Sequence, residues 1–239
     1  MPKYISSYGH IVLEKPSGIF VKCNQVMRGY STSPFNGGIR NIQYVFNHQL
    51  KSWIETSADL PGGSVEGYLQ KIATESGWDH SRTTGLMTTA SMQHAAIVRD
   101  CYKDAALFAV ITAGTRFNAV RAGEPGAYYE ISPGSFVPLS GTINIILILE
   151  FALPEASLAR TPIIITEAKC AALQEHRIPS CNSHAIATGT GTDGMIVLCN
   201  PSGSPCFTDV GTHSKVGELI GRTVFKGVIE ALEKEGSIR

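Results

Sequence analysis

The chain has 239 residues, and its 20 Lys and Arg residues balance its 20 Asp and Glu residues, so the formal net charge is zero. This length suffices for one large domain whose core needs no cross-links, and neutrality gives no electrostatic reason to expect a nucleic-acid partner. The apolar run at 143–153 is about half as long as a membrane-spanning helix, so no membrane span is expected.

The N-terminus and the cysteines both indicate a cytoplasmic protein. The segment "MPKYISSYGH" lacks the charged region followed by an apolar one that marks a secretory signal. The six cysteines are scattered and form no C-x-x-C pair, which argues against a disulfide framework or a structural zinc site. Reduced thiols are expected. The sequence leaves the oligomeric state open.

The first half of the chain reads mainly as strands around one helix. Strand-like "GIFVKC" (18–23) and turn-like "SPFNGG" (33–38) come first. Apolar residues at steps of three and four then predict a helix within 61–78, with Gly77 as its stop. Strands are expected over 83–92, 94–102, 106–114 and, buried, over 141–153.

The second half alternates helices and strands. Thr161 and Pro162 suit the N-cap and first turn of a helix that runs to His176. Strands are expected at 184–188 and 194–199, and an apolar stripe predicts a last helix over 213–236, ended by Gly236. Without repeats or linkers, these elements predict a single mixed α/β domain over 1–239, in which helices pack on β-sheet of undetermined strand order.

The segment "GTGTDG" (189–194) matches the dinucleotide-binding pattern G-x-G-x-x-G letter for letter. That pattern needs a helix directly after the loop, whose amides hold the pyrophosphate. Here "MIVLC" follows, which is short and β-branched. The segment is therefore interpreted as strand, loop and strand, and a nicotinamide cofactor is not expected.

Small polar loops recur at the ends of the apolar strands. Glycines let backbone approach a ligand closely, and threonines supply uncharged hydroxyls. Each loop alone is typical of a turn, but together they favour a polar cleft if they converge. The four loops are 112–124, 140–145, 188–194 and 210–221.

Several of these segments occur in the order found in one family. They are "GLMTTA" (85–90), "TAG" (112–114) with Asn118, "RAG" (121–123), "GTINIIL" (141–147), "TEAKCAAL" (166–173), "ATGTGTDG" (187–194) and "GTHSKVGELIG" (211–221). From about Val26 to Leu232 the chain resembles the CbiZ adenosylcobinamide amidohydrolases, with the first 25 or so residues outside the resemblance. Ser214 stands where the family tends to have Thr, which keeps the hydroxyl.

The resemblance implies a hydrolase of corrinoid salvage and cobalamin biosynthesis. It would cleave the amide between the corrin side chain and aminopropanol in adenosylcobinamide, giving adenosylcobyric acid and 1-amino-2-propanol. Cobalt would enter inside the substrate, so no resident cofactor is expected. The histidines are far apart and show no H-E-x-x-H or similar spacing, so a protein-bound metal is not expected either. The alternative is a non-catalytic protein that binds corrinoids or cobalt chelates for uptake.

Amide hydrolysis needs an attacking group, donors for the oxyanion and an acid for the departing amine. We hypothesise that His213 and Asp193 carry the protons, because histidine titrates near neutrality and a carboxylate can orient its ring. A structural histidine, and an aspartate that caps its own loop, are the alternatives. Glu167 is a third catalytic candidate, or else a solvated helix residue.

Other residues complete the expected site. Glu167 and Lys169 are two apart and do not share a helix face, whereas Lys215 and Glu218 are three apart and could pair structurally. A threonine hydroxyl activated by a base is an open possibility for the nucleophile. The predicted substrate-binding residues are Thr112, Asn118, Thr142, Asn144, Thr190, Thr192, Thr212 and Lys215.

Overall fold

The computed structural model describes residues 4–5, 8–51, 54, 56–126 and 141–238. The helices are α1 (Val65–Glu75), α2 (Glu155–Glu175) and α3 (Lys215–Glu235), with short 3-10 turns η1 (Ser57–Asp59), η2 (His80–Arg82) and η3 (Met92–His94). The strands are β1 (Tyr4–Ile5), β2 (Ile11–Lys15), β3 (Gly18–Ser31), β4 (Gly38–Gln49), β5 (Thr83–Thr88), β6 (Ala96–Tyr102), β7 (Ala105–Ala113), β8 (Ala119–Val120), β9 (Ile143–Leu149), β10 (Gly189–Thr190) and β11 (Gly194–Cys199).

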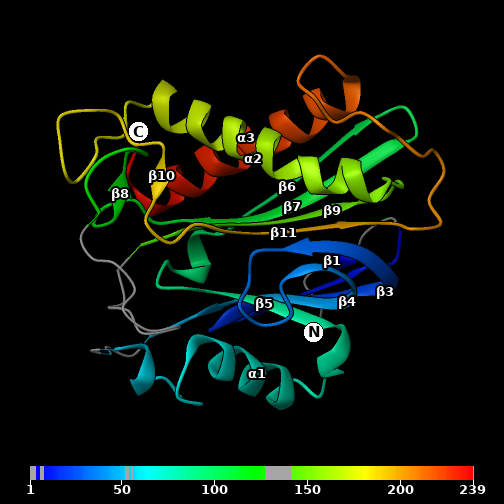
Figure 1. Cartoon of the computed structure of the whole chain (residues 1–239), viewed down its shortest axis with the longest axis horizontal. Helices are drawn as coiled ribbons and strands as arrows, with labels where there is room; N and C mark the ends of the chain where they lie inside the picture. Colours follow the sequence, from blue (N-terminus) through cyan, green and yellow to red (C-terminus); the bar gives the residue numbers. More distant parts are fainter. Residues whose placement is uncertain (1–3, 6–7, 52–53, 55, 127–140, 239) are drawn as a thin grey trace.

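The elements stack in four layers, helix, sheet, sheet and helix (Figure 1). Helices α2 and α3 cover one face of β6, β7, β9 and β11, while α1 covers the outer face of the layer that contains β3, β4 and β5. Apolar side chains under α2 and α3, and under α1, form two clusters, and a separate apolar cluster fills the space between the two sheet layers. The predicted α/β domain with helices packed on mixed sheet is confirmed.

The central strands alternate between two cores. In β9, Ile145 and Leu147 pack toward α2 and α3, whereas Ile146 and Ile148 pack toward the second sheet layer. Because successive side chains of a strand point to opposite faces, a strand buried on both faces is apolar throughout. This explains the apolar run at residues 145–149 of β9.

A single strand joins the two sheet layers. Residues 18–22 of β3 pair with β2, and residues 28–31 of β3 pair with β11. Strand β4 pairs with both of these parts of β3. The register shifts between Lys22 and Met27. An irregularity of this kind bends a strand and increases its twist, so β3 can belong to both layers of one nine-stranded sheet.

The strand register brings distant loops to one end of the sheet. Thr112 near the end of β7 pairs with Asn144 near the start of β9, and Asn144 pairs in parallel with Gly194 at the start of β11. Helix α3 ends here too, since Thr115 Oγ1 donates to Ser237 Oγ at 3.2 Å. The loops that begin β9 and β11 therefore lie next to the loop that follows β7.

Most predicted elements are confirmed, with two corrections. Helix α2 begins at Glu155, so Pro162 lies inside it and Thr161 is not its N-cap. The predicted strand at 184–188 is a bent loop, in which Ser180 N donates to Ala185 O and Ala187 N to Ile178 O. These local bonds take the place of a strand ladder. Among the described helices, none is long and apolar enough to cross a membrane.

The "GTGTDG" segment has the predicted form. Gly189–Thr190 is the short strand β10, which pairs with β8, and Gly194 begins β11. A strand follows the glycines, as the sequence indicated, and the dinucleotide-binding geometry is not formed.

Candidate functional site

Three of the four polar loops meet at the end of the sheet where β9 and β11 begin. Asn118 Nδ2 donates to Gly141 O at 2.9 Å and to Thr192 Oγ1 at 3.3 Å. Thr142 Oγ1 donates to Thr192 O at 2.7 Å. The predicted convergence is confirmed for the loops 112–124, 140–145 and 188–194.

Asp193 lies at the centre of these loops. Its Oδ1 accepts from Ile143 N at 3.1 Å, from Thr190 N at 3.1 Å and from Thr190 Oγ1 at 2.5 Å. Its Oδ2 forms an ion pair with Lys169 Nζ from α2. The side chains of Lys169 and Asp193 are 11% and 16% exposed, so the pair is largely screened from water but remains within reach of a ligand.

The local sequence explains why this pair can form. Gly189 lies against both charged groups, and a β-carbon there would collide with Asp193 Oδ2 and Lys169 Nζ. Asp193 also bonds the amide of Thr190 three residues earlier, as turn aspartates often do. The carboxylate thus shapes its own loop and binds a cation from a distant helix.

The three threonines considered as nucleophiles differ in their partners. Thr190 Oγ1 donates to the Asp193 carboxylate. Thr192 Oγ1 donates to the backbone oxygen of Gly141 at 3.1 Å. Thr212 lies elsewhere, in a groove between α2 and α3. Only Thr190, among these three, has a hydroxyl that already contacts a carboxylate.

Two predicted substrate-binding residues are enclosed in the core. Thr112 and Asn144 are each 1% exposed and are joined through Asn47, whose Nδ2 donates to Thr112 Oγ1 at 2.8 Å and whose Oδ1 accepts from Asn144 Nδ2 at 2.9 Å. Asn144 Nδ2 also donates to Met87 O. They close the polar end of the core between the sheet layers, so their predicted contact with a corrin rim is wrong in this geometry.

Asn118 and Thr142 are also buried, with their side-chain groups bonded within the loops. They hold the loops together in this structure. Of the predicted binding residues near Asp193, Thr192 is exposed and Thr190 is 9% exposed.

The fourth loop lies at the other end of α3. His213 precedes the helix by two residues, its side chain is 79% exposed, and its Nε2 lies 2.8 Å from Asp209 Oδ2. The 21 residues of α3 span about 30 Å, and the helix ends beside the loops that surround Asp193. The predicted pairing of His213 with Asp193 is therefore wrong.

Glu167 and Lys169 project from different faces of α2. Lys169 is 9% exposed and turns toward Asp193, whereas Glu167 is exposed on the outer face. The absence of a local pair between them agrees with their spacing. Lys215 Nζ bonds Glu218 Oε2 at 2.6 Å on the surface, which confirms the structural pair and leaves Lys215 far from Asp193.

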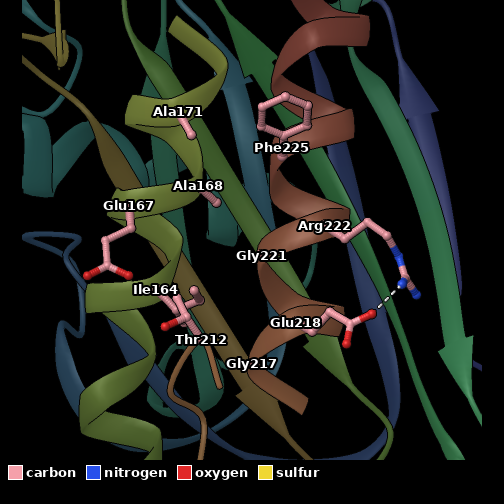
Figure 2. A pocket seen from close by; sticks show the side chains of 10 residues that line it. All are labelled: Ile164, Glu167, Ala168, Ala171, Thr212, Gly217, Glu218, Gly221, Arg222 and Phe225. Atoms are coloured by element: carbon pink, nitrogen blue, oxygen red, sulfur yellow. Dashed lines mark hydrogen bonds and ion pairs between the residues drawn. The ribbon is translucent and has the colours of Figure 1, made fainter. Parts of the chain in front are cut away.

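A groove of about 400 Å³ separates α2 and α3 on the outer face of the helix layer (Figure 2). Ala168, Gly217 and Gly221 line it, and Glu167 and Arg222 project from opposite helices. Next to it, a cavity of about 180 Å³ contains Glu167, Thr212 and His213. The predicted catalytic residues thus divide between two places, with Asp193 at the sheet end and Glu167 near His213.

Sequence reasoning did not assign Lys169 to the site. The signal was a lysine within a helix of small and apolar residues, "TEAKCAAL". Its partner is 24 residues away along the chain, so helix spacing could not identify it. Within the described residues, no group of three or more His, Cys, Asp or Glu side chains is arranged to hold a metal ion.

Comparison with known proteins identifies the family. The sequence model of the CbiZ family, described as adenosylcobinamide amidohydrolase, matches residues 2–239. The chain belongs to the adenosylcobinamide amidohydrolase family. The match includes residues 2–25, which the motifs alone had left outside the resemblance.

Two curated relatives align with most of the chain. The chain is 33% identical over 215 residues to the uncharacterized protein MJ1613 of Methanocaldococcus jannaschii, covering 84% of this chain and 81% of that protein. It is 29% identical over 209 residues to the adenosylcobinamide amidohydrolase of Methanosarcina mazei, covering 84% and 88%. Among solved structures, the PH0078 protein of Pyrococcus horikoshii has a TM-score of 0.45 at 12% identity, covering 95% of this chain and 83% of that one.

Proposed function

We propose that this chain hydrolyses the amide that joins aminopropanol to the corrin side chain in adenosylcobinamide, releasing adenosylcobyric acid and 1-amino-2-propanol. The observation that carries the proposal is the family match over residues 2–239. The relative of that name from Methanosarcina mazei, aligned over most of both chains, supports it.

The chemistry is assigned to Thr190, Asp193 and Lys169. The Thr190 hydroxyl donates to Asp193, so the carboxylate can take a proton from this hydroxyl, or from a water in its place, during attack on the amide carbon. The Lys169 ammonium group next to Asp193 can stabilise the oxyanion. The proton taken up by the carboxylate then returns to the departing amine. If Thr190 is the attacking group, the product of this step is an acyl-threonine ester, which a water molecule then hydrolyses to release the acid and to restore the hydroxyl.

The substrate brings its own cobalt, and the proposed reaction needs no resident cofactor. All six cysteines are free, which fits a reducing compartment such as the cytoplasm.

A non-catalytic corrinoid-binding protein is the competing function. An uncharged, amide-rich ligand gives little reason to maintain a largely buried ion pair beside a threonine hydroxyl, which favours the enzyme. The test is to incubate the purified chain with adenosylcobinamide and to measure free 1-amino-2-propanol and adenosylcobyric acid. Both products should form in equal amounts. Tight binding of adenosylcobinamide without either product would instead establish the binding protein.

A further inference from the structure

Helix α2 presents a ridge of exposed side chains on the outer side of the molecule. Its inner face packs on the sheet, with Leu158 and Ile165 fully buried. The helices form the outermost layer on this side, so no further layer of described residues covers the other face of α2 (Figure 1). The residues of that face follow one another at steps of three or four and share one side of the helix. This α2 ridge consists of Ala156, Arg160, Ile163, Glu167 and Ala171, all of which are exposed.

The centre of the α2 ridge is apolar. Ile163 is 58% exposed there, and with Ile164 it lines the cavity of about 180 Å³ beside the 210–213 segment. Ile164 also lines the groove of about 400 Å³ between α2 and α3, together with Ala168, Gly221 and Phe225 (Figure 2). A lone exposed apolar residue is ordinary, but an apolar surface that continues into a groove and has a polar rim is typical of a contact with another protein.

Arg160 and Glu167 carry opposite charges on either side of this apolar centre. They are seven residues apart, about 10 Å along the helix axis, and they do not pair with each other. Neither side chain forms a hydrogen bond or an ion pair with a residue that the structure describes. Arg160 acts on Asp209 only at longer range, and that carboxylate already contacts His213 Nε2 at 2.8 Å. The ridge thus offers one cation and one anion to a partner.

The positions of these charges make the ridge complementary to itself. In an antiparallel pair of identical helices, a twofold axis through a point on the helix face brings each residue opposite the one equally far beyond that point. With the axis between Ile163 and Ile164, Arg160 of one copy faces Glu167 of the other. The symmetry repeats this contact, so two ion pairs form and the isoleucines lie between them.

The two ends of the ridge obey the same symmetry. Ala156 and Ala171 are equally far from the axis, so each faces the other in the pair. Such small side chains keep the distance between helix axes at the short end of the usual range of roughly 8–10 Å. Ile163 then lies against Ile164 of the second copy, at the side of its groove. The ridge therefore matches its own symmetry copy in size and in charge along its whole length.

We propose that the α2 ridge is the interface of a homodimer, in which two copies of this chain pack antiparallel through α2. One helix face contributes most of the contact, so the dimer is reversible, with a Kd of roughly 1–100 µM. Lys169 lies on the inner side of the same helix and turns toward Asp193, so the dimer leaves the proposed site uncovered. The inference does not depend on the proposed function.

The test measures the oligomeric state of the full chain by sedimentation equilibrium. The unaltered chain should pass from monomer to dimer between about 1 and 100 µM. Arg160→Glu places like charges at both symmetry-related contacts and should raise the Kd at least ~10-fold, as should Glu167→Arg. Ile163→Ser removes the apolar centre twice per dimer and should also raise the Kd at least ~10-fold. The double variant Arg160→Glu/Glu167→Arg exchanges the charges and should dimerise within about threefold of the unaltered chain.

Mixing the two single charge variants is the sharpest measurement. Arg160→Glu and Glu167→Arg complement each other at both contacts, so an equimolar mixture should form a heterodimer at a concentration where each alone is monomeric. Lys71→Glu is the matched control, because it makes the same change of charge at an exposed position of α1, on the far side of the molecule (Figure 1). It should leave the Kd unchanged. All the substituted side chains are exposed, and thermal unfolding verifies that each variant is folded.

Three outcomes would overturn the proposal. An unaltered chain that stays monomeric up to about 100 µM would leave the ridge to a different partner. A dimer that survives both single charge reversals would form through another surface. Disruption by the single variants without recovery in the mixture and in the double variant would show that Arg160 does not face Glu167 of the second copy. Hydrolysis of adenosylcobinamide enters none of these measurements, so a failure of the proposed function leaves this inference standing.

Discussion

Lys169 on α2 forms an ion pair with Asp193 in the loop before β11. The side chain of Lys169 is 11% exposed and that of Asp193 is 16% exposed, so the pair is largely buried. The same carboxylate bonds the amides of Thr190 and Ile143, which belong to two different loops. The pair therefore fixes the position of both loops relative to α2. Its loss should affect stability as well as turnover.

Lys169→Met keeps most of the side-chain volume but leaves Asp193 without its cation. We expect unfolding by urea to show a loss of about 2–3 kcal/mol, since removal of one partner leaves a largely buried charge. Turnover of adenosylcobinamide should fall at least ~100-fold. Lys226→Met, at an exposed position of α3, is the control and should change neither quantity. Normal turnover in Lys169→Met would remove this lysine from the proposed chemistry.

Gly189 gives a second approach to the same pair. A β-carbon at this position would collide with Asp193 Oδ2 and Lys169 Nζ, so Gly189→Ala should separate the two groups and lower turnover at least ~10-fold. Gly221→Ala is the matched control, because its β-carbon would lie 3.4 Å from Ile164 Cδ1 and the residue is inside α3. That variant should keep its activity and gain up to ~1 kcal/mol in stability. Equal activities in the two variants would contradict the prediction.

The local elements were predictable from the sequence because their causes are local. The run "INIILIL" has the residue types of a strand buried on both faces, and it forms β9. Gly236 ends α3 with a φ of +82°, a conformation that glycine adopts without strain. Periodicity and capping chemistry suffice for such features.

The arrangement of the site depended on long-range pairing and was only partly predictable. The parallel register of Asn144 with Gly194 brings two of the polar loops together, and no local pattern encodes it. The run of α3 back along the sheet separates His213 from Asp193, although both lie in glycine-rich loops. Residue type identified polar loops correctly, but strand order decided which of them meet.

His213 supplies the test of that separation. The proton-carrying role that the sequence suggested for His213 would imply a large loss of turnover in His213→Ala. Because its ring is 79% exposed and contacts Asp209 at the far end of α3, we now expect turnover within about threefold of the unaltered chain. Asp193→Asn, measured in parallel with the same substrate, should lose at least ~100-fold. A large loss in His213→Ala would show that the 210–221 loop takes part in the reaction after all.

Asp100 and Arg222 should make stability depend on pH in the acid range. Arg222 Nε donates to Asp100 Oδ2 at 2.6 Å, and this bond lowers the pKa of Asp100 in the folded chain. A lowered pKa stabilises the fold above the unfolded value of about 3.9, and the contribution disappears as the pH falls through the folded value. Since Arg222 is 38% exposed, the contribution is below ~1 kcal/mol.

The measurement compares urea unfolding of the unaltered chain and Asp100→Asn at pH 7 and pH 3. The variant should have a lower free energy of unfolding than the unaltered chain at pH 7. The difference between the two free energies should become smaller at pH 3. Asp104→Asn, at an exposed position, controls for general acid effects. If the difference in the free energy of unfolding is the same at both pH values, the Asp100 carboxylate does not stabilise the fold.

Pro162 inside α2 leads to the last prediction. Proline has no amide hydrogen, so the carbonyl oxygen of Leu158 loses its usual donor four residues later. Thr161 replaces it, since its Oγ1 donates to Leu158 O at 2.7 Å and the residue is fully buried. Thr161→Val keeps the shape but leaves this carbonyl without a donor, which should cost about 1–2 kcal/mol in urea unfolding.

Two further variants separate this effect from a general loss of a hydroxyl. In a Pro162→Ala background the new amide can donate to Leu158 O, so Thr161→Val should cost less there, with a coupling of about 1 kcal/mol in the double-mutant cycle. Thr223→Val removes a similar bond, from Thr223 Oγ1 to Leu219 O at 2.8 Å in α3, but there the backbone amide of Thr223 remains as a donor. It should therefore cost less than Thr161→Val. Equal costs in the two helices, together with no coupling to Pro162, would show that Thr161 does not compensate for the proline.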